Sequence, residues 1–492
     1  MGGIMVVTPA SSVISKKTIS RLKKIPSSEE IGKIGFVKLK RFENKNSDEL
    51  KTVRIEDILD VTDNYEISSA DFTWTYSKFS NNKSVGWNGF MEKLHTNLTY
   101  HTSKIIPVPF IKNPPSDYDT IFTSLVQAAK QCQKQEQKIV FVTFDQPLYH
   151  KARGILASID LDNDPYNLSS IQVRLGGFHL LMSFLGAIGF IMDGSGLKEA
   201  FCEIYAENSS DKALSGHEYA RGIRRHFLVQ LALSELIFSS MELSDSEKGL
   251  MDGFLLNLGT ENVEDNLQHE DFKMIKEKFI EHLKLVQKRG PTAKLWIQYW
   301  EMISLVKDFI RAERASNWEL HLKCVEKMLP YFHASGHFLY AKSAHLYLQD
   351  MRKLKDTIND DYEYMQFTEE FFTIRRTHKF WSGVWTDMTI EQVLMRSMKT
   401  QGGLTHGRGL SESVLTKFVL TMIILVEVCN EMEDFCNVSF ATTEQHIDSR
   451  EYRIKRDVAD LQILQKFFTG MILFQRLITL CQYFLELLAV IL

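Results

Sequence analysis

The sequence lacks the motifs of several common enzyme classes. It contains no serine nucleophile elbow, no protein-kinase signature and no cysteine–histidine protease signature. Its six cysteines are scattered without a CxxC pair, and no charged segment precedes a long apolar run at the front, as it would in a secretory signal. We therefore expect an intracellular protein with reduced thiols.

Neither sign of charge is in large excess, because 58 Lys and Arg residues face 62 Asp and Glu residues. This balance argues against a protein that coats nucleic acid nonspecifically. A local basic segment does occur between residues 15 and 41, and it includes Lys16, Lys17, Lys23 and Lys24. Two interpretations stay open for it, a solvated tail or a segment for nuclear targeting or phosphate contact. The basic segment favours a nuclear over a cytoplasmic location.

The chain is too long, at 492 residues, for one ordinary hydrophobic core. Its 44% hydrophobic and 24% charged content is typical of globular proteins. Composition and periodicity predict five parts. A basic mobile arm covers residues 1–55, an α/β domain covers 56–200, and a helical domain or insertion covers 201–380. Residues 381–470 contain an acidic helix, a Gly-rich loop and closing helices, and 471–492 form an apolar tail.

Strand and helix patterns alternate in the α/β part. The aromatic and β-branched stretch 71–79 predicts a strand, and 103–111 predicts a proline-containing edge strand. Helical spacing follows at 120–135, and the apolar run 138–144 is typical of a strand covered on both faces. A further strand and a long apolar helix, near 171–192, complete the pattern. Alternating elements of this kind predict an α/β unit, followed by a large all-α part.

The apolar stretch 471–492 is long enough to cross a bilayer. Arg476 and Glu486 lie inside it, and both are costly in a membrane. We expect a buried terminal helix and no membrane partner, while a spanning tail and an aberrant end of the reading frame stay open.

Asp145 directly follows the predicted strand 138–144. In α/β folds the carboxyl end of a buried strand is a rigid place for metal ligands and catalytic acids. A carboxylate there can hold Mg²⁺ or Mn²⁺, and two such ions can assist strand transfer or hydrolysis of nucleic acid. Asp145 also precedes Pro147, so the alternative is a helix cap without chemistry.

Two further acidic residues and one histidine are candidates for the same site. Asp387 and Glu391 lie one helical turn apart, so they share a helix face on which Glu391 can be a second metal ligand opposite Asp145. Capping and complementation of the helix dipole would explain both equally. His179 follows two glycines at a strand-to-helix turn, where a buried core histidine is the alternative to a ligand.

Two basic segments are candidates for phosphate contact. The Gly-rich stretch 400–413 contains His406 and Arg408 and leads into a predicted helix, whose start can bind phosphate. Arg221, Arg224 and Arg225 lie within about one and a half helical turns. They can face phosphate, or they can pair with the acidic region 241–270. A flexible surface loop is the alternative for the first segment.

The chain contains the segments KIVFVTFDQPLYHKA, VRLGGFHLLMSFLGAIG, GSGLKEAF, SGHEYARGIRRH, RGPTAKLW, HFLYAKSAHLYLQDM, WTDMTIEQVLMRSMKTQGGLTHGRG and FATTEQH. Together these segments resemble a large group of uncharacterised eukaryotic proteins, present in many copies in invertebrate genomes, that look derived from mobile elements. The resemblance spans about residues 60–470, and the apolar tail departs from it. It implies membership of that group, which carries no established activity.

The order of elements is also similar to the RNase H-like core of cut-and-paste transposases, a mixed sheet with a helical insertion. In that scheme Asp145 is the middle acid, Glu391 the last, and Asp71 a poorly matching first acid. The implied function is phosphoryl transfer on DNA with Mg²⁺ or Mn²⁺, without a small organic cofactor, by a protein that can form homo-oligomers. The alternative is a non-catalytic helical interaction protein.

Overall fold

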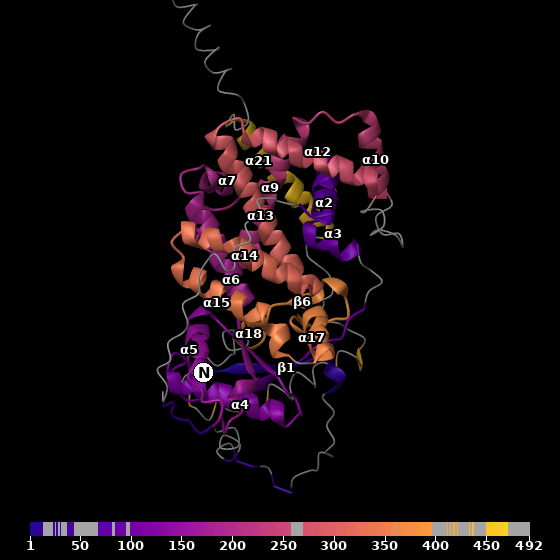
Figure 1. The fold of residues 1–492 in the computed structure, drawn as a ribbon. Coiled ribbons are helices and arrows are strands. Elements are labelled where there is room, and N and C mark those ends of the chain that lie inside the picture. Colours follow the sequence, from indigo (N-terminus) through magenta and orange to yellow (C-terminus); the bar gives the residue numbers. More distant parts are fainter. Residues whose placement is uncertain are drawn as a thin grey trace, which may run out of the picture.

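The computed structural model describes residues 1–12, 37–43, 67–80, 84–94, 99–256, 269–358, 360–395 and 449–470, with a few short pieces between 23 and 30 and between 411 and 436. The described chain is mostly helical, and its strands form three sheets of two strands each. Figure 1 shows an elongated molecule with β1, α4 and α5 towards one end and α10 and α12 towards the other.

A β–α–β unit positions Asp145. β3 (Val140–Phe144) and β4 (Ile171–Leu175) pair in parallel, and α5 (Gln146–Ala157) connects them. α4 (Tyr118–Gln133) precedes this unit and α6 (Gly177–Ile191) follows it. The predicted alternation of helix and strand in this region is therefore confirmed.

The other two sheets are antiparallel and small. β1 (Gly3–Val7) pairs with β2 (Lys104–Val108), and β5 (Ile374–Arg375) pairs with β6 (Gly383–Val384). β2 lies within the predicted edge strand, and its Pro107 has a paired strand on one side only, as a proline in a strand requires.

The strand predicted at residues 71–79 is wrong, because this stretch is helix α2 (Ser69–Ser80). Phe72, Tyr76 and Phe79 are spaced by four and three residues, so they share one helix face. All three rings pack on Phe238, with centroids 6.0, 5.8 and 5.1 Å from it. Burial of this aromatic face outweighs the strand preference of the individual residues.

The RNase H-like mixed sheet is also not found in the described residues. The strand expected to carry the first acid is helical, and β1 and β2 pair with each other rather than with β3 or β4. The α/β character of the chain is therefore confined, within the described ranges, to the β3–α5–β4 unit and its flanking helices.

α13 (Pro291–Ala315) packs against α6, α9, α12 and α14, and its Trp296, Trp300 and Phe309 are buried. Hydrophobic side chains from α2 to α21 form one contiguous core. The other helices are α3 (Trp87–Leu94), α7 (Leu197–Ile204), α8 (Glu207–Leu214), α9 (Tyr219–Ser239), α10 (Asp245–Leu256), α12 (Glu270–Gln287), α14 (Trp318–Ala334), α15 (Phe338–Arg352), α16 (Leu354–Thr357), α17 (Asp361–Gln366), α18 (Thr386–Ile390) and α21 (Glu451–Gly470).

Short turns of other helical types accompany them, and the two π-helical turns are Phe367–Phe371 and Glu391–Met395. Across the described parts of the chain, none of the helices combines the length and the apolar character needed to span a membrane. The apolar stretch 471–492 lies outside the described residues.

Candidate functional site

Two helices begin side by side at one edge of the parallel strand pair. Phe144 ends β3 opposite Leu175 of β4, and the Gly176 amide donates a hydrogen bond to the Phe144 carbonyl oxygen at 2.8 Å. Asp145 is the N-cap residue of α5, and Gly176 is the N-cap residue of α6. The positive ends of two helix dipoles therefore meet where Asp145 leaves the strand.

Asp387, from α18, caps α6 although it lies far away in the sequence. Its Oδ1 accepts a hydrogen bond from the Phe178 amide at 3.1 Å, and its Oδ2 accepts one from the His179 amide at 3.0 Å. A Cβ atom on Gly176 would lie 2.5 Å from Asp387 Oδ2, and one on Gly177 would lie 2.4 Å from Trp385 Cδ1. The two glycines are therefore needed so that α18 can approach the start of α6.

His179 is held in one orientation by the same carboxylate. Its Nδ1 lies 2.9 Å from Asp387 Oδ2. Because both Asp387 oxygens already accept backbone amides, Nδ1 must donate, which leaves Nε2 as the acceptor. The hydrogen bond to Asp387 raises the pKa of His179; burial opposes this, and the charges of Asp387, Asp145 and Glu391 add to it. The side chain is 37% exposed, so a ligand can reach it.

Asp145 has an oxygen atom that the fold does not use. Its Oδ1 is buried and has no hydrogen-bond partner. Burial raises the pKa of Asp145, the Leu148 amide and the charge of His179 lower it, and the charge of Asp387 raises it further. The ionised carboxylate is therefore kept in a position where a cation or a proton would stabilise it.

Glu391 and Tyr340 complete the surroundings. Glu391 starts a π-helical turn directly after α18, and its charge contributes to the raised pKa of His179. π-Helical turns often occur at functional sites. Burial raises the pKa of Tyr340, and the charges of Asp145 and Asp387 raise it further. We refer to Asp145, His179, Asp387 and Glu391 as the Asp145 cluster.

The cluster could bind a cation together with a phosphate, or act by general acid–base chemistry. Asp387 is occupied by its three hydrogen bonds, which leaves Asp145, Glu391 and His179 Nε2 to meet a ligand. In the described part of the chain no group of three or more His, Cys, Asp or Glu side chains could by itself hold a metal ion. Mg²⁺, however, usually keeps several waters and uses only one or two protein carboxylates with substrate phosphate.

Asp71, the third acid predicted for the site, lies elsewhere. It is buried on α2, its Oδ1 accepts a hydrogen bond from Trp87 Nε1 at 2.5 Å, and its Oδ2 pairs with Arg311. Burial raises its pKa, but the charges of Arg311 and Lys307 and these hydrogen bonds outweigh burial, so the net pKa is lowered. We refer to Asp71, Trp87, Lys307 and Arg311 as the Asp71 cluster, and it shares no residue with the Asp145 cluster.

The predicted phosphate-facing arginines are mostly used within the fold. Arg224 is buried and its Nε donates to Asp457 Oδ1 at 2.7 Å, while Arg225 is fully buried and donates to the Ser209 carbonyl oxygen at 2.8 Å. The acidic partner of Arg224 comes from α21 rather than from the region 241–270. Of the three arginines only Arg221, whose side chain is 65% exposed, is accessible to an external phosphate.

The remaining predicted basic residues divide into two groups. Lys23 and Lys24 are exposed, whereas Lys16, Lys17, His406 and Arg408 lie outside the described residues. Tyr340 and the pairing of His179 with Asp387 were not predicted from the sequence. The double glycine before His179 was the available signal, since it marks a place where another segment comes very close.

Comparison with known proteins gives a family but no activity. A family model described as "Domain of unknown function (DUF8702)" matches residues 86–482. This range contains the whole Asp145 cluster and excludes Asp71. No curated protein and no solved structure matches the chain.

Proposed function

The chain belongs to this family of unknown function, and we propose that it is a transposase-derived protein that acts on DNA by phosphoryl transfer at the Asp145 cluster. The observation that carries the proposal is the buried, unpartnered Oδ1 of Asp145 beside His179, at an edge where two helices begin. A carboxylate with an unused oxygen attracts a cation, and a cation held there can in turn meet a phosphate.

Each residue of the cluster has a role in this proposal. Asp145 and Glu391 would hold Mg²⁺ or Mn²⁺, and the ion would offset the negative charge that develops on the transferred phosphate. His179 Nε2 accepts the proton of an attacking water as the water oxygen bonds to phosphorus and the bond to the leaving 3′ oxygen breaks, and that 3′ oxygen takes a proton from solvent. Asp387 holds the imidazole ring in the required orientation, as second-shell carboxylates do.

The choice of DNA as substrate depends on the resemblance to mobile-element proteins and on the basic segment near the front of the chain. Lys23 and Lys24 of this segment are exposed and so can meet phosphate. The same segment supports a nuclear location. Arg408 and His406 remain our candidates for further phosphate contacts.

Nicking of supercoiled plasmid in Mg²⁺ or Mn²⁺ tests the proposal without knowledge of the target sequence. We expect nicking by the unmodified protein and a loss of about 100-fold or more in Asp145→Asn and His179→Gln. Asp160→Asn is the matched control, because Asp160 is an exposed carboxylate just after α5.

Equal rates in Asp145→Asn and the unmodified protein would remove the catalytic proposal. The chain would then be a helical interaction protein in which the β3–α5–β4 unit serves only as scaffold. A background nuclease is recognised by nicking that persists in both site variants.

A further inference from the structure

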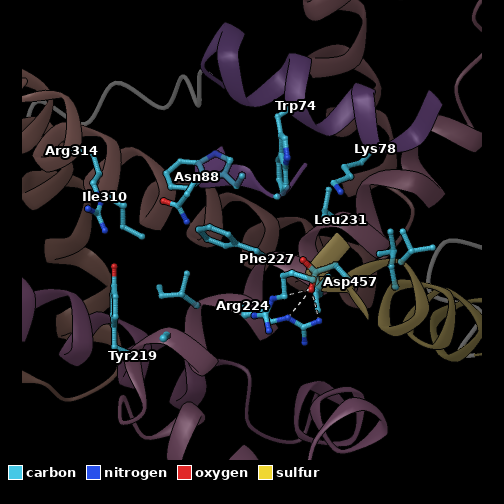
Figure 2. Close-up of a pocket in the computed structure, with 18 residues that line it drawn as sticks. Trp74, Lys78, Asn88, Tyr219, Arg224, Phe227, Leu231, Ile310, Arg314 and Asp457 are labelled. Carbon is cyan, nitrogen blue, oxygen red and sulfur yellow. Dashed lines mark hydrogen bonds and ion pairs between the residues drawn. The ribbon is translucent and has the colours of Figure 1, made fainter. Parts of the chain in front are cut away.

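A second site lies in the helical half of the molecule and shares no residue with the Asp145 cluster. A cavity of about 200 Å³ opens between α2, α3, α9, α13 and α21. Figure 2 shows Trp74, Tyr219 and Phe227 around it, with Arg314 on one side and Arg224 with Asp457 on another. Trp87 is a further aromatic ring in its lining.

The aromatic walls are fixed before any ligand arrives. Trp74 Nε1 donates to the Val85 carbonyl oxygen at 3.2 Å, and Trp87 Nε1 donates to Asp71 Oδ1. The Trp87 and Phe227 rings lie edge to face at 5.3 Å. Rigid aromatic side chains lose little conformational entropy on binding, so such walls suit a flat apolar ring.

Cationic side chains outnumber carboxylates in the lining of the cavity. Among the described residues that line the cavity, Asp457 is the one carboxylate, and four residues are cationic: Lys78, Arg224, Arg314 and Arg453. Asp457 accepts hydrogen bonds from Arg224 and lies 3.6 Å from Arg453 Nε. It cannot neutralise Arg314 as well, so an anion is the complementary partner.

Arg314 is a cation of the lining that forms no ion pair with a described carboxylate. Its side chain hydrogen-bonds Tyr219, and its Nε is buried without a hydrogen-bond partner in the described chain. Its neighbour Glu313 does not cancel its charge, because burial raises the pKa of Glu313 to about 8 and the carboxyl is mostly neutral at pH 7. A guanidinium that lines the cavity without a carboxylate partner can meet a carboxylate or phosphate there.

We propose that this cavity binds a small planar aromatic anion, one or two fused rings carrying a single carboxylate or phosphate. The ring lies among Trp74, Trp87 and Phe227, and the anionic group meets Arg314. The size is adequate, since an apolar cavity of about 150 Å³ accommodates benzene. The ligand is either a free aromatic acid or a nucleotide, because both present this chemistry.

Calorimetric titration with three probes tests the proposal on the full chain. Naphthalene-2-carboxylate supplies ring and charge, naphthalene-2-carboxamide supplies the ring alone, and dAMP represents a nucleotide. We expect the carboxylate to bind at least 10-fold more tightly than the amide. Tighter binding of dAMP than of the carboxylate would identify a nucleotide as the ligand, and the reverse would identify a free acid.

Variants then locate the site. Arg314→Gln should weaken carboxylate binding about 10-fold without changing amide binding, and Arg314→Lys should restore part of the loss. Ala220→Trp places a large side chain at an exposed position of the lining and should abolish binding of both. Arg221→Gln is the matched control, because it removes an exposed cation from α9, the helix of Ala220, at a position outside the cavity.

Equal affinity for carboxylate and amide, or unchanged carboxylate binding in Arg314→Gln, would overturn the proposal. Absence of binding by all three probes at millimolar concentration would overturn it as well. Circular dichroism of each variant separates lost binding from lost folding. None of these outcomes bears on plasmid nicking, so this proposal and the proposed function fail independently.

Discussion

Two clusters of this protein each contain an aspartate that the sequence suggested as a catalytic acid, and they treat it in opposite ways. In the Asp71 cluster both carboxylate oxygens are bonded, by Trp87 and Arg311, and the net pKa is lowered. In the Asp145 cluster one oxygen is buried without a partner, and burial raises the pKa. The first aspartate stabilises the fold, whereas the second keeps an unpartnered oxygen, at which we propose that a ligand binds.

The contrast shows how to separate structural from functional acids. A buried carboxylate that is fully paired contributes to stability and has nothing left to offer a substrate. One that lacks partners costs stability, and a fold retains such a cost mainly at functional sites. Substitutions at the two aspartates should therefore change the free energy of unfolding in opposite directions.

The largest effect is expected at Asp71. Asp71→Asn removes the charge that faces both Lys307 and Arg311 and leaves Arg311 with Asp308 as its remaining carboxylate partner, so we expect the free energy of unfolding to fall by about 3–5 kcal/mol. Urea denaturation followed by tryptophan fluorescence measures it. A loss below about 1 kcal/mol would mean that Asp71 is not the anchor that its contacts indicate.

The next effect concerns the approach of α18 to α6. Gly177→Ala places a Cβ against Trp385, so we expect a loss of about 1–3 kcal/mol and a weaker contact between His179 and Asp387. Gly154→Ala is the control, because nothing lies within 4 Å of its new Cβ in α5. That control should gain about 0.5–1 kcal/mol. Equal effects at both glycines would show that α18 does not pack there.

Asp145→Asn should have a small effect of the opposite sign to Asp71→Asn. Asparagine caps a helix as well as aspartate does, so we expect the free energy of unfolding at neutral pH to be unchanged or higher by up to about 1 kcal/mol. The folded pKa of Asp145 is raised. The protein therefore loses stability relative to Asp145→Asn as pH rises through that pKa, and below about pH 3.8 this part of the difference vanishes.

The smallest effect in energy is at His179, where a direct measurement is available. Its folded pKa is raised, so the stabilisation is fully present below about pH 6.5 and is lost as pH rises through the folded pKa. Titration of the imidazole by NMR should give a pKa above 6.5 that falls in Asp387→Asn. A value that is equal in both proteins would contradict the pairing.

Local elements could be predicted from the sequence, and contacts across the chain could not. The apolar run before Asp145 and the spacing of 120–135 predicted β3 and α4 correctly. The strand at 71–79 was wrong because strand preference was weighed above the helical spacing of Phe72, Tyr76 and Phe79. The predicted RNase H-like sheet needed that strand, so this prediction is wrong as well for the described residues.

The members of the candidate site were visible in the sequence, but their arrangement was not. Asp145, His179, Asp387 and Glu391 were each singled out by their position relative to a strand or a helix. The bond between His179 and Asp387 joins residues 208 positions apart, and no local pattern encodes such a contact. The orphaned oxygen of Asp145 likewise depends on neighbours that only the folded chain supplies.

Calorimetric titration with Mn²⁺ tests most directly whether the Asp145 cluster is a cation site. We predict saturable binding to the unmodified protein, weakened about 10-fold or more in Asp145→Asn and Glu391→Gln, and unchanged in Asp160→Asn. Mn²⁺ affinity that is the same in Asp145→Asn as in the unmodified protein would contradict the account.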